Sequence, residues 1–336
     1  MKVLKLGLIA LIVLVVFGSC YQWYASYVDG IEYPAPGKLI EVGEGYLHID
    51  CRGQGDVTLV LESGLGMNSS SWSLIHDPLS EHARVCAYDR PGMGWSDPIS
   101  RISLAPDISD RLKRLLDRAG ENGPHILVGM SAGGVFVRQY YKQYPDNVVG
   151  MVLVDSSHEQ QENRVPGFDR GLDYLLQACR ILQPIGWVRL SGEMDQMAPT
   201  GMSDEWVSAW AANQNRSYAC NSFHYAIESF VREVADPLPP ISLGKLPLLV
   251  ISQGNDPKGD PTGDYTDEMA KEQRRIWDEL QIELMQLSSD ATRVIAKQSG
   301  HVIQFDQPEL VIESILHLIE GLPDTVVPQE NVVELL

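Results

Sequence analysis

Apolar positions divide the chain into three kinds of region. An unbroken apolar run extends from Leu6 to Phe17, close to the N-terminus. Further along, compact aliphatic runs alternate with stretches whose apolar residues recur at helical spacing. Between residues 156 and 240 only helical spacing occurs, in the segments 170–190 and 204–234, with no strand run between them.

The compact runs predict the strands of one sheet. Residues 38–53 alternate apolar and polar positions around Gly43 and Gly45, which predicts an antiparallel hairpin. Later runs are apolar on both faces, as parallel strands covered by helices on both sides are. They are residues 57–63, 83–89, 125–130, 148–155, 246–252 and 291–297. We therefore expect an α/β fold with a mostly parallel sheet, into which residues 156–240 are inserted as a helical cap.

These patterns predict six segments in a chain of 336 residues, which is long enough to bury a core without a metal or a disulfide. The proline-rich sequence IEYPAPG at residues 31–37 predicts a linker after the N-terminal run. The segments are 1–24 (membrane anchor or signal segment), 25–37 (linker), 38–155 (first part of the core), 156–240 (helical cap), 241–322 (second part of the core) and 323–336 (C-terminal tail).

The N-terminal run is a membrane-targeting segment with three interpretations. It spans the membrane as an anchor from Val3 to Tyr24, with Tyr21, Trp23 and Tyr24 at the interface, or it is a cleaved signal peptide, or it leads to a lipid on Cys20. Lys2 and Lys5 precede the run and stay cytoplasmic under the positive-inside rule. The folded part is then extracytoplasmic and membrane-anchored, or secreted or periplasmic if the segment is removed.

Charge and cysteine content narrow the partners and the compartment. The 45 acidic residues exceed the 26 basic ones, so a net charge of -19 disfavours binding to nucleic acid. We expect a small-molecule partner, and contact with the membrane through the N-terminal segment. In an oxidising compartment Cys51, Cys86, Cys179 and Cys220 allow three pairings, whereas Cys51 and Cys86 also fit small buried residues of strands.

Residues 129–133, Gly-Met-Ser-Ala-Gly, fit the nucleophile elbow, in which a serine occupies a strained turn from a strand into a helix. Glycine is needed two residues before and after Ser131 because the turn leaves no room for Cβ atoms. The apolar run before the serine predicts the strand, and the helical pattern after it, which ends at Pro145, predicts the helix. The positive end of that helix dipole would point at Ser131.

A serine hydroxyl becomes a strong nucleophile only when a base takes its proton. His301 is the candidate base, because it follows the last strand run at a glycine-marked turn. His48, His125, His158 and His224 are weaker candidates. An acid should orient the histidine, and Asp256 is favoured because it follows the strand run nearer the histidine, with Asp155 and Asp260 left open. A solvated loop carboxylate or a helix cap is the alternative for each of them.

Two backbone N–H groups are expected to stabilise the oxyanion of a tetrahedral intermediate. One belongs to Ala132, directly after the serine. The other candidate is Leu65, which lies between Gly64 and Gly66. These two glycines would also fit a simple turn without any role in the reaction.

Four motifs in this order make the chain resemble the α/β-hydrolase superfamily, and capped serine hydrolases in particular, from about Leu39 to Leu322. They are VLESGLG, YDRPGMGWSD (Tyr88–Asp97), GMSAGG and SGHVIQFDQPELV. The resemblance implies an α/β-hydrolase fold, with a mainly parallel eight-stranded sheet and a lid after the sixth strand. It also implies a Ser131, Asp256 and His301 triad, a shaping role for the DRPGMGWSD loop, and no metal or organic cofactor.

The resemblance also implies that the second strand lies antiparallel beside the fourth, so that Cys51 faces Cys86. We predict that disulfide and a second one, Cys179 to Cys220, across the cap. The chain departs from the family pattern at Ser63-Gly64, where many relatives have His-Gly. It departs again at Asp256, which follows Gly254 by two residues rather than three and so keeps Asp260 open.

The implied function is a serine hydrolase that cleaves a carboxylic ester, or an amide, through an acyl-enzyme intermediate. A serine at the elbow argues against relatives that open epoxides or displace halide with an aspartate. An acyltransferase with the same triad and a non-catalytic binding module are the alternatives. The aromatic residues of the cap fit packing or, as a hypothesis, a pocket for apolar acyl groups; they include Trp187, Trp206, Trp210 and Phe223.

Overall fold

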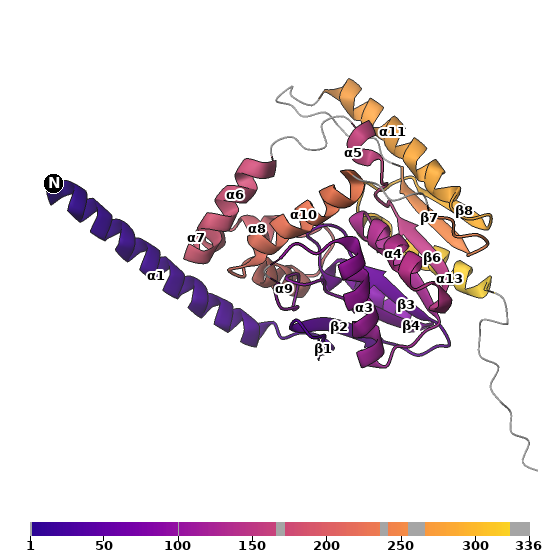
Figure 1. Ribbon diagram of the computed structural model, residues 1–336, viewed down its shortest axis with the longest axis horizontal. Helices are drawn as coiled ribbons and strands as arrows, with labels where there is room; N and C mark the ends of the chain where they lie inside the picture. Colours follow the sequence, from indigo (N-terminus) through magenta and orange to yellow (C-terminus); the bar gives the residue numbers. More distant parts are fainter. Residues whose placement is uncertain (1, 100, 166–171, 236–240, 255–265, 323–336) are drawn as a thin grey trace, which may run out of the picture.

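The computed structural model describes residues 2–99, 101–165, 172–235, 241–254 and 266–322. Within them, one sheet carries helices on both faces, a group of inserted helices covers one of its edges, and a long N-terminal helix projects from the body (Figure 1). The predicted α/β-hydrolase fold is confirmed.

The sheet has eight strands in the order β1-β2-β4-β3-β5-β6-β7-β8. β1 pairs antiparallel with β2, and β2 antiparallel with β4, while every other pairing is parallel. The strands are β1 (Lys38–Glu41), β2 (Tyr46–Arg52), β3 (Thr58–Glu62), β4 (Arg84–Tyr88), β5 (His125–Met130), β6 (Val148–Val154), β7 (Leu248–Gln253) and β8 (Ala291–Ala296). Each predicted strand run forms one of them.

The register places the ends of three strands side by side. Glu62 at the end of β3 lies beside Gly129 of β5, and Met130 at the end of β5 lies beside Val154 of β6. In parallel sheets the carboxyl ends of the strands form the usual ligand-binding edge. Loops that follow β3, β5 and β6 therefore meet at one place.

Two apolar clusters flank the sheet, one on each face. One contains residues of α2 (Ser73–Ser80), α12 (Ile303–Asp306) and α13 (Pro308–Glu320), and the other contains residues of α3 (Ala105–Ala119), α4 (Ala132–Gln143) and α11 (Asp267–Met285). α3 shows the pattern: it buries Ile108, Leu112, Leu115 and Leu116, which share one face at helical spacing. A short 3-10 turn at Ser69–Trp72 (η1) adds Trp72 to the first cluster, and a second 3-10 turn lies at Pro145–Asn147 (η2) before β6.

The inserted helices lie between β6 and β7, where a cap was expected, and the described part of residues 156–240 contains no strand. They are α5 (Gln161–Arg164), α6 (Leu172–Leu182), η3 (Gln183–Ile185), α7 (Trp187–Ser191), α8 (Glu193–Gln196), α9 (Asp204–Gln214) and α10 (Ala219–Ala235). We call them the cap; its predicted boundaries at 156 and 240 stay a prediction.

Both predicted disulfides form. Cys51 of β2 lies opposite Cys86 of β4 in the antiparallel register and is bonded to it. Cys179 of α6 is bonded to Cys220 of α10, which ties two cap helices together. Cys20 is free and exposed.

The N-terminal helix α1 (Lys2–Glu32) is long and apolar enough to cross a membrane, and its side chains are exposed up to Phe17. It continues through residues 25–32, where a linker was expected. The reason is that its second half packs on the cap: Gln22 is buried and Asp29 pairs with Arg189 of α7 at 2.7 Å. The proline-rich signal marked only the end of this helix.

Candidate active site

Ser131 occupies the strained turn that the sequence predicted, with φ 54° and ψ −125° between β5 and α4. A Cβ atom on Gly129 would lie 2.7 Å from the Gly133 carbonyl oxygen, and one on Gly133 would overlap the carbonyl oxygen of Glu62. Both glycines are thus required sterically, because α4 starts against the ends of β3 and β5. The close packing fixes where the Ser131 hydroxyl points.

Backbone hydrogen bonds hold this turn on its other side. Ser131 N–H donates to the carbonyl of Val154 at 3.1 Å, and the Ser131 carbonyl accepts from Gly134 N–H at 3.0 Å and from Ser157 N–H at 2.9 Å. The end of β6 therefore supports the serine directly.

His301 reaches the serine from the turn that follows β8. Its Nε2 lies 2.9 Å from the Ser131 hydroxyl oxygen, and its Nδ1 lies 2.6 Å from Asp155 Oδ2. A carboxylate accepts at Nδ1, so that nitrogen carries the proton and Nε2 is left as the acceptor for the serine hydroxyl. The His301 side chain is 42% exposed, so solvent and small molecules reach it.

In the structure Asp155 occupies the position at His301 Nδ1 that was expected for Asp256. Asp256 and Asp260 lie outside the described residues. Asp155 follows β6, which pairs directly with β5, the strand that precedes Ser131. Asp256 was favoured because it follows β7, which lies one strand further from β5. Asp155 was left open as an alternative in the sequence. The feature that could have identified it is its position directly after the strand that lies beside the nucleophile elbow.

The Asp155 carboxylate is fully buried and held by two further donors. Its Oδ1 accepts from Gln253 N–H and from Trp277 Nε1–H, both at 3.0 Å. The Trp277 ring also meets His301 edge-on, with ring centroids 5.7 Å apart. Sequence reasoning missed Gln253 and Trp277, since nothing in the helical pattern of α11 distinguishes one tryptophan that points at the sheet edge.

The two expected oxyanion donors lie together beside Ser131. Leu65 packs against a cluster that contains Ala132 and Phe136, and a Cβ atom on Gly64 would lie 3.4 Å from Ser131 Cβ. Among the described residues, no turn, loop or side-chain acceptor takes the N–H of Leu65 or of Ala132. Both donors are therefore free for a ligand.

Arg90 fixes the peptide group that carries one of these donors. Its Nη2 donates to the Gly64 carbonyl at 2.5 Å, and its Nη1 donates to the Ser63 carbonyl at 2.6 Å. In a trans peptide the C=O of Gly64 and the N–H of Leu65 point in opposite directions. The Arg90 contact therefore turns the Leu65 N–H away from the guanidinium.

Arg90 belongs to a buried polar group that the sequence did not reveal. Its guanidinium also contacts the Glu62 carboxylate, which accepts from the Tyr88 hydroxyl as well. Burial raises the pKa of Glu62 against the opposing charge of Arg90, and burial followed by the Glu62 charge raises the pKa of Tyr88. The DRPGMGWSD loop is thus not only a shaping element, because its arginine braces the loop after β3.

A second histidine–aspartate pair lies elsewhere in the core. His48 Nδ1 contacts Asp89 Oδ2 at 2.7 Å, and neither side chain is exposed. For His48 burial lowers the pKa, but the charge and hydrogen bond of Asp89, together with the Pro36 carbonyl, outweigh burial and the pKa is raised. For Asp89 burial raises the pKa, but the charge and hydrogen bond of His48, together with the N–H groups of Ser69 and Trp95, outweigh burial and the pKa is lowered.

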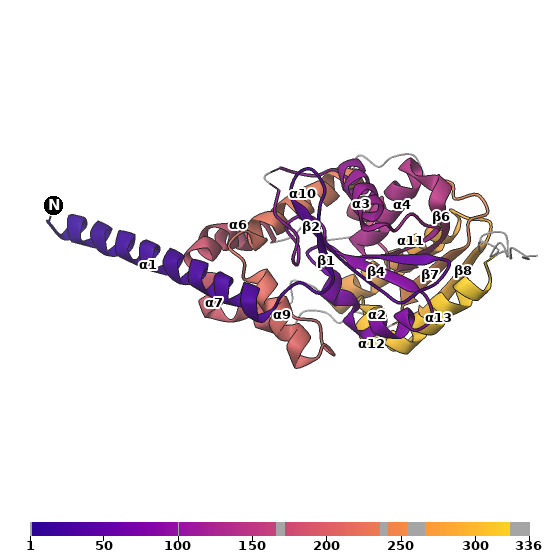
Figure 2. The same cartoon turned by 90° about the horizontal axis from the view of Figure 1, so that it is seen from below.

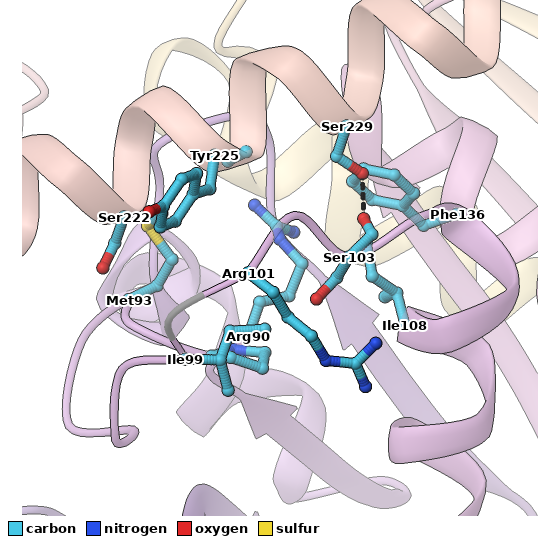
Figure 3. A pocket seen from close by; sticks show the side chains of 12 residues that line it. Arg90, Met93, Ile99, Arg101, Ser103, Ile108, Phe136, Ser222, Tyr225 and Ser229 are labelled. Carbon is cyan, nitrogen blue, oxygen red and sulfur yellow. Dashed lines mark hydrogen bonds between the residues drawn. The ribbon is translucent and has the colours of Figure 1, made fainter. Parts of the chain in front are cut away.

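A pocket of about 430 Å³ opens between α10 and the loop after β4 (Figure 3). The Ser229 hydroxyl of α10 donates to the Ser103 carbonyl across it. Phe136 lines the pocket and also belongs to the cluster of Leu65 and Ala132, so the pocket adjoins that cluster. The other side chains that Figure 3 labels are Arg90, Met93, Ile99, Arg101, Ile108, Ser222 and Tyr225.

The cap aromatics divide between packing and exposure. Trp210 is buried, and Trp206 packs with it around Phe305. Phe223 lies against Gly66 of the loop after β3, where it would meet any added Cβ. Trp187 is exposed and belongs to none of the apolar clusters of the described residues.

Among the described residues, one group has ligand atoms close enough together to hold a metal ion: Cys51, Cys86 and Glu121. The two sulfurs are joined in a disulfide, so neither is a thiolate that a metal ion could use. The expectation that no cofactor is needed stays a prediction.

A strained serine between a strand and a helix, with a histidine and a buried aspartate that follow two other strands at the same edge of the sheet, defines the α/β-hydrolase class. A family model described as "Alpha/beta hydrolase family" matches residues 59–314, and the chain belongs to this family. The resemblance seen in the sequence is thereby confirmed, and hydrolase activity is what the family supports.

Individual relatives are distant. A pimeloyl-[acyl-carrier protein] methyl ester esterase of Shewanella is 39% identical over 111 residues, which cover 33% of this chain and 39% of that protein. Two curated relatives that match 84% and 80% of this chain are matched over only 42% and 56% of their own length, so the chain spans about half of them.

Solved structures show the same fold with different chemistry. A thermophilic esterase from Thermogutta terrifontis superposes with a TM-score of 0.56 at 20% identity, covering 85% of this chain and 97% of its own. An epoxide hydrolase from Bacillus megaterium superposes with a TM-score of 0.62 at 16% identity, covering 84% and 100%. The likeness establishes the fold and leaves the reaction to the residues of the site.

Proposed function

We propose that this protein is a serine hydrolase that cleaves a carboxylic ester through an acyl-enzyme intermediate. The observation that carries the proposal is the continuous chain from Asp155 through His301 to the Ser131 hydroxyl, with links of 2.6 and 2.9 Å. All three groups come from strand ends at one edge of the sheet. The partial likeness to a methyl ester esterase supports an ester as the substrate.

Ser131 is the nucleophile and His301 is the general base. As the serine oxygen attacks the ester carbonyl carbon, its proton passes to His301 Nε2, and the imidazolium then returns that proton to the leaving alcohol. Water repeats the sequence on the acyl-enzyme and releases the acid. Asp155 keeps the ring in the tautomer that leaves Nε2 unprotonated, and Gln253 N–H and Trp277 hold the aspartate.

Leu65 N–H and Ala132 N–H are the proposed oxyanion donors. They would stabilise the negative charge that develops on the substrate carbonyl oxygen beside Ser131. Such donors contribute most when their positions are fixed before the reaction. The Arg90 contacts with the two preceding carbonyls supply that rigidity.

The proposal predicts a burst with a p-nitrophenyl ester. Acylation releases one nitrophenolate for each active site before turnover sets in, since the acyl-enzyme accumulates. Ser131→Ala should abolish the burst and lower kcat on the order of 10⁵-fold or more. Ser69→Ala, a change of a buried serine away from Ser131, is the matched control and should keep the burst; equal burst amplitudes in wild type and Ser131→Ala would overturn the proposal.

The same assay separates the alternatives. An acyltransferase would form an ester product when an alcohol is added, at the expense of the free acid. A non-catalytic binding module would show neither burst nor turnover. A rate that rises with acyl chain length would support an apolar acyl site, for which the pocket beside Phe136 is the candidate.

We further propose that α1 is a retained membrane anchor. Its outer half is part of the folded body: Gln22 Nε2 donates to the Asn215 carbonyl at 2.5 Å, and Asp29 pairs with Arg189. Removing the segment as a signal peptide would leave these partners without their bonds. Intact mass of the protein purified from membranes tests this, because an anchor keeps residue 1 onward while lipidation at Cys20 would leave a chain that starts there.

A further inference from the structure

The edge of the cap next to α1 carries exposed apolar side chains. In both views α6 and α7 form the part of the folded body nearest the N-terminal half of α1, and Figure 1 shows α6 running across the direction of α1 (Figures 1 and 2). The exposed apolar side chains of these two helices, which we call the cap patch, are Leu175 and Ile181 of α6 and Trp187 and Leu190 of α7, each 61–75% exposed. An apolar group of this kind marks an interaction site.

The cap patch starts at the level where the apolar run of α1 ends. A Cβ atom on Gly18, the residue after Phe17, would overlap the carbonyl of Ile185, and one on Gly186 would lie 3.0 Å from the Tyr21 ring. Trp187 follows Gly186 directly. The tryptophan therefore lies close to the level of Tyr21.

That level is where α1 leaves an apolar environment. Four aromatic side chains of α1 follow the apolar run and are exposed: Tyr21, Trp23, Tyr24 and Tyr27. Such residues collect at the interface between lipid tails and water. The contact between α1 and the cap extends from Gly18 to Asp29, which pairs with Arg189 of α7. Over these residues α1 rises about 16 Å. The contact with the cap therefore covers the interfacial part of α1.

The contact between α1 and the cap also leads to the reaction site. Asn215, just after α9, accepts from Gln22 of α1, and its neighbour Gln214 donates to the Gly66 carbonyl at 3.1 Å. Gly66 directly follows Leu65, the proposed oxyanion donor. Two consecutive residues thus join the membrane helix to the loop beside Ser131.

We propose that the cap patch rests in the interfacial layer of the membrane that α1 crosses, and that the enzyme takes its ester substrates from that membrane. This inference rests on the proposed function and on the retained anchor. A bilayer is the occupant because the patch continues the exposed apolar surface of α1 on the same side of the body. Attraction to anionic headgroups does not contribute to this contact, since a net charge of -19 on the chain would repel them.

Depth measurement tests the position of the patch. The full chain with Cys20→Ser is labelled with an environment-sensitive fluorophore at Leu190→Cys, or at Ile282→Cys on α11 as the control, which is also apolar and exposed. In phosphatidylcholine nanodiscs that hold one chain each, we expect quenching by a lipid-borne quencher at position 190 and none at 282. Equal quenching, or shielding at 190 only when several chains share a membrane, would overturn the proposal, the latter in favour of a second copy.

Substrate presentation tests the second half. The double variant Trp187→Ser with Leu190→Ser should hydrolyse a long-chain ester embedded in phosphatidylcholine vesicles roughly tenfold more slowly, or worse. Hydrolysis of water-soluble p-nitrophenyl butyrate should be unchanged, as should both rates in Ile282→Ser. Equal loss on both esters, or no loss on the embedded ester, would overturn the inference, whereas absence of any hydrolysis in the wild type would instead contradict the proposed function.

Discussion

Two histidine–aspartate pairs of nearly the same geometry lie in this molecule, in different surroundings. His301 contacts Asp155 at 2.6 Å and His48 contacts Asp89 at 2.7 Å. The Nε2 atom of His301 contacts the Ser131 hydroxyl, whereas the Nε2 atom of His48 contacts the Pro36 carbonyl. A histidine–aspartate pair is therefore not in itself a reactive site; a free acceptor nitrogen beside an accessible hydroxyl is what distinguishes the first pair.

The Asp89 pair instead holds the molecule together. Asp89 also accepts from Ser69 N–H at 2.6 Å and from Trp95 N–H at 3.0 Å, so its carboxylate joins η1 to the DRPGMGWSD loop. Trp95 Nε1–H in turn donates to the Tyr33 carbonyl at 3.0 Å, just after α1. The Asp89 carboxylate and Trp95 thus link the end of α1 to the sheet.

Replacing the Asp155 carboxylate should have the largest effect and should best distinguish the roles of the two histidine–aspartate pairs. In Asp155→Asn the amide favours the wrong tautomer of His301, and kcat should fall by about 10⁴-fold with little change in the fold. Steady-state hydrolysis of p-nitrophenyl butyrate measures it. Asp256→Asn, at the position that sequence reasoning favoured, is the matched control and should keep its rate; the reverse ranking would restore Asp256 as the acid.

Removing His48 should act on stability rather than on rate. His48→Gln leaves the Asp89 carboxylate buried without its charged partner, and breaking such a pair costs about 3–5 kcal/mol. We expect the free energy of unfolding in denaturant to fall by that amount, with kcat of the folded enzyme retained. A kcat that drops as far as in Asp155→Asn would mean that the two pairs do not differ in role.

Arg90 should affect the reaction by an intermediate amount. In Arg90→Lys a single ammonium cannot hold both the Ser63 and Gly64 carbonyls, so the Leu65 N–H loses its fixed direction. We expect kcat to fall roughly tenfold to a hundredfold, short of the loss seen when an oxyanion donor is removed outright, with KM nearly constant. Arg101→Lys, an exposed arginine of the same loop region, is the control; a rise in KM alone would contradict a positioning role for Arg90.

The pH dependence of stability should show the smallest effect. The raised pKa of His48 means that its contribution is complete below about pH 6.5 and is lost as pH rises through the folded-state pKa. The lowered pKa of Asp89 means that its contribution is complete above about pH 3.8 and is lost as pH falls through the folded-state value. The difference in unfolding free energy between wild type and His48→Gln should thus be widest between these limits; a difference independent of pH would contradict the pair.

Sequence reasoning reached the fold, both disulfides and two members of the hydrogen-bonded chain. Ser131 and His301 were found because glycine spacing and a position after the last strand are local signals. Asp155 needed the strand order, since the choice between it and Asp256 depends on which strand end lies beside the serine.

What remained hidden depends on contacts far apart in the chain. In the sequence Arg90 belongs to a predicted turn. Only the packing of the loop after β3 shows which carbonyl groups its guanidinium contacts. The docking of α1 on the cap joins residues more than 150 positions apart, such as Gln22 and Asn215, which are 193 apart. Neither hydropathy nor spacing carries information about such a pair.

Mapping of a covalent label tests the central claim most directly. A fluorophosphonate reacts with a serine only where a base activates it, and both Ser131 and Ser69 have a histidine nearby, at 2.9 and 3.5 Å. Peptide mass spectrometry after labelling of the full chain should find the adduct on Ser131 in wild type and no adduct in Ser131→Ala or His301→Ala. An adduct on Ser69, or equal labelling of Ser131→Ala, would contradict the assignment of Ser131, His301 and Asp155 as the reactive group.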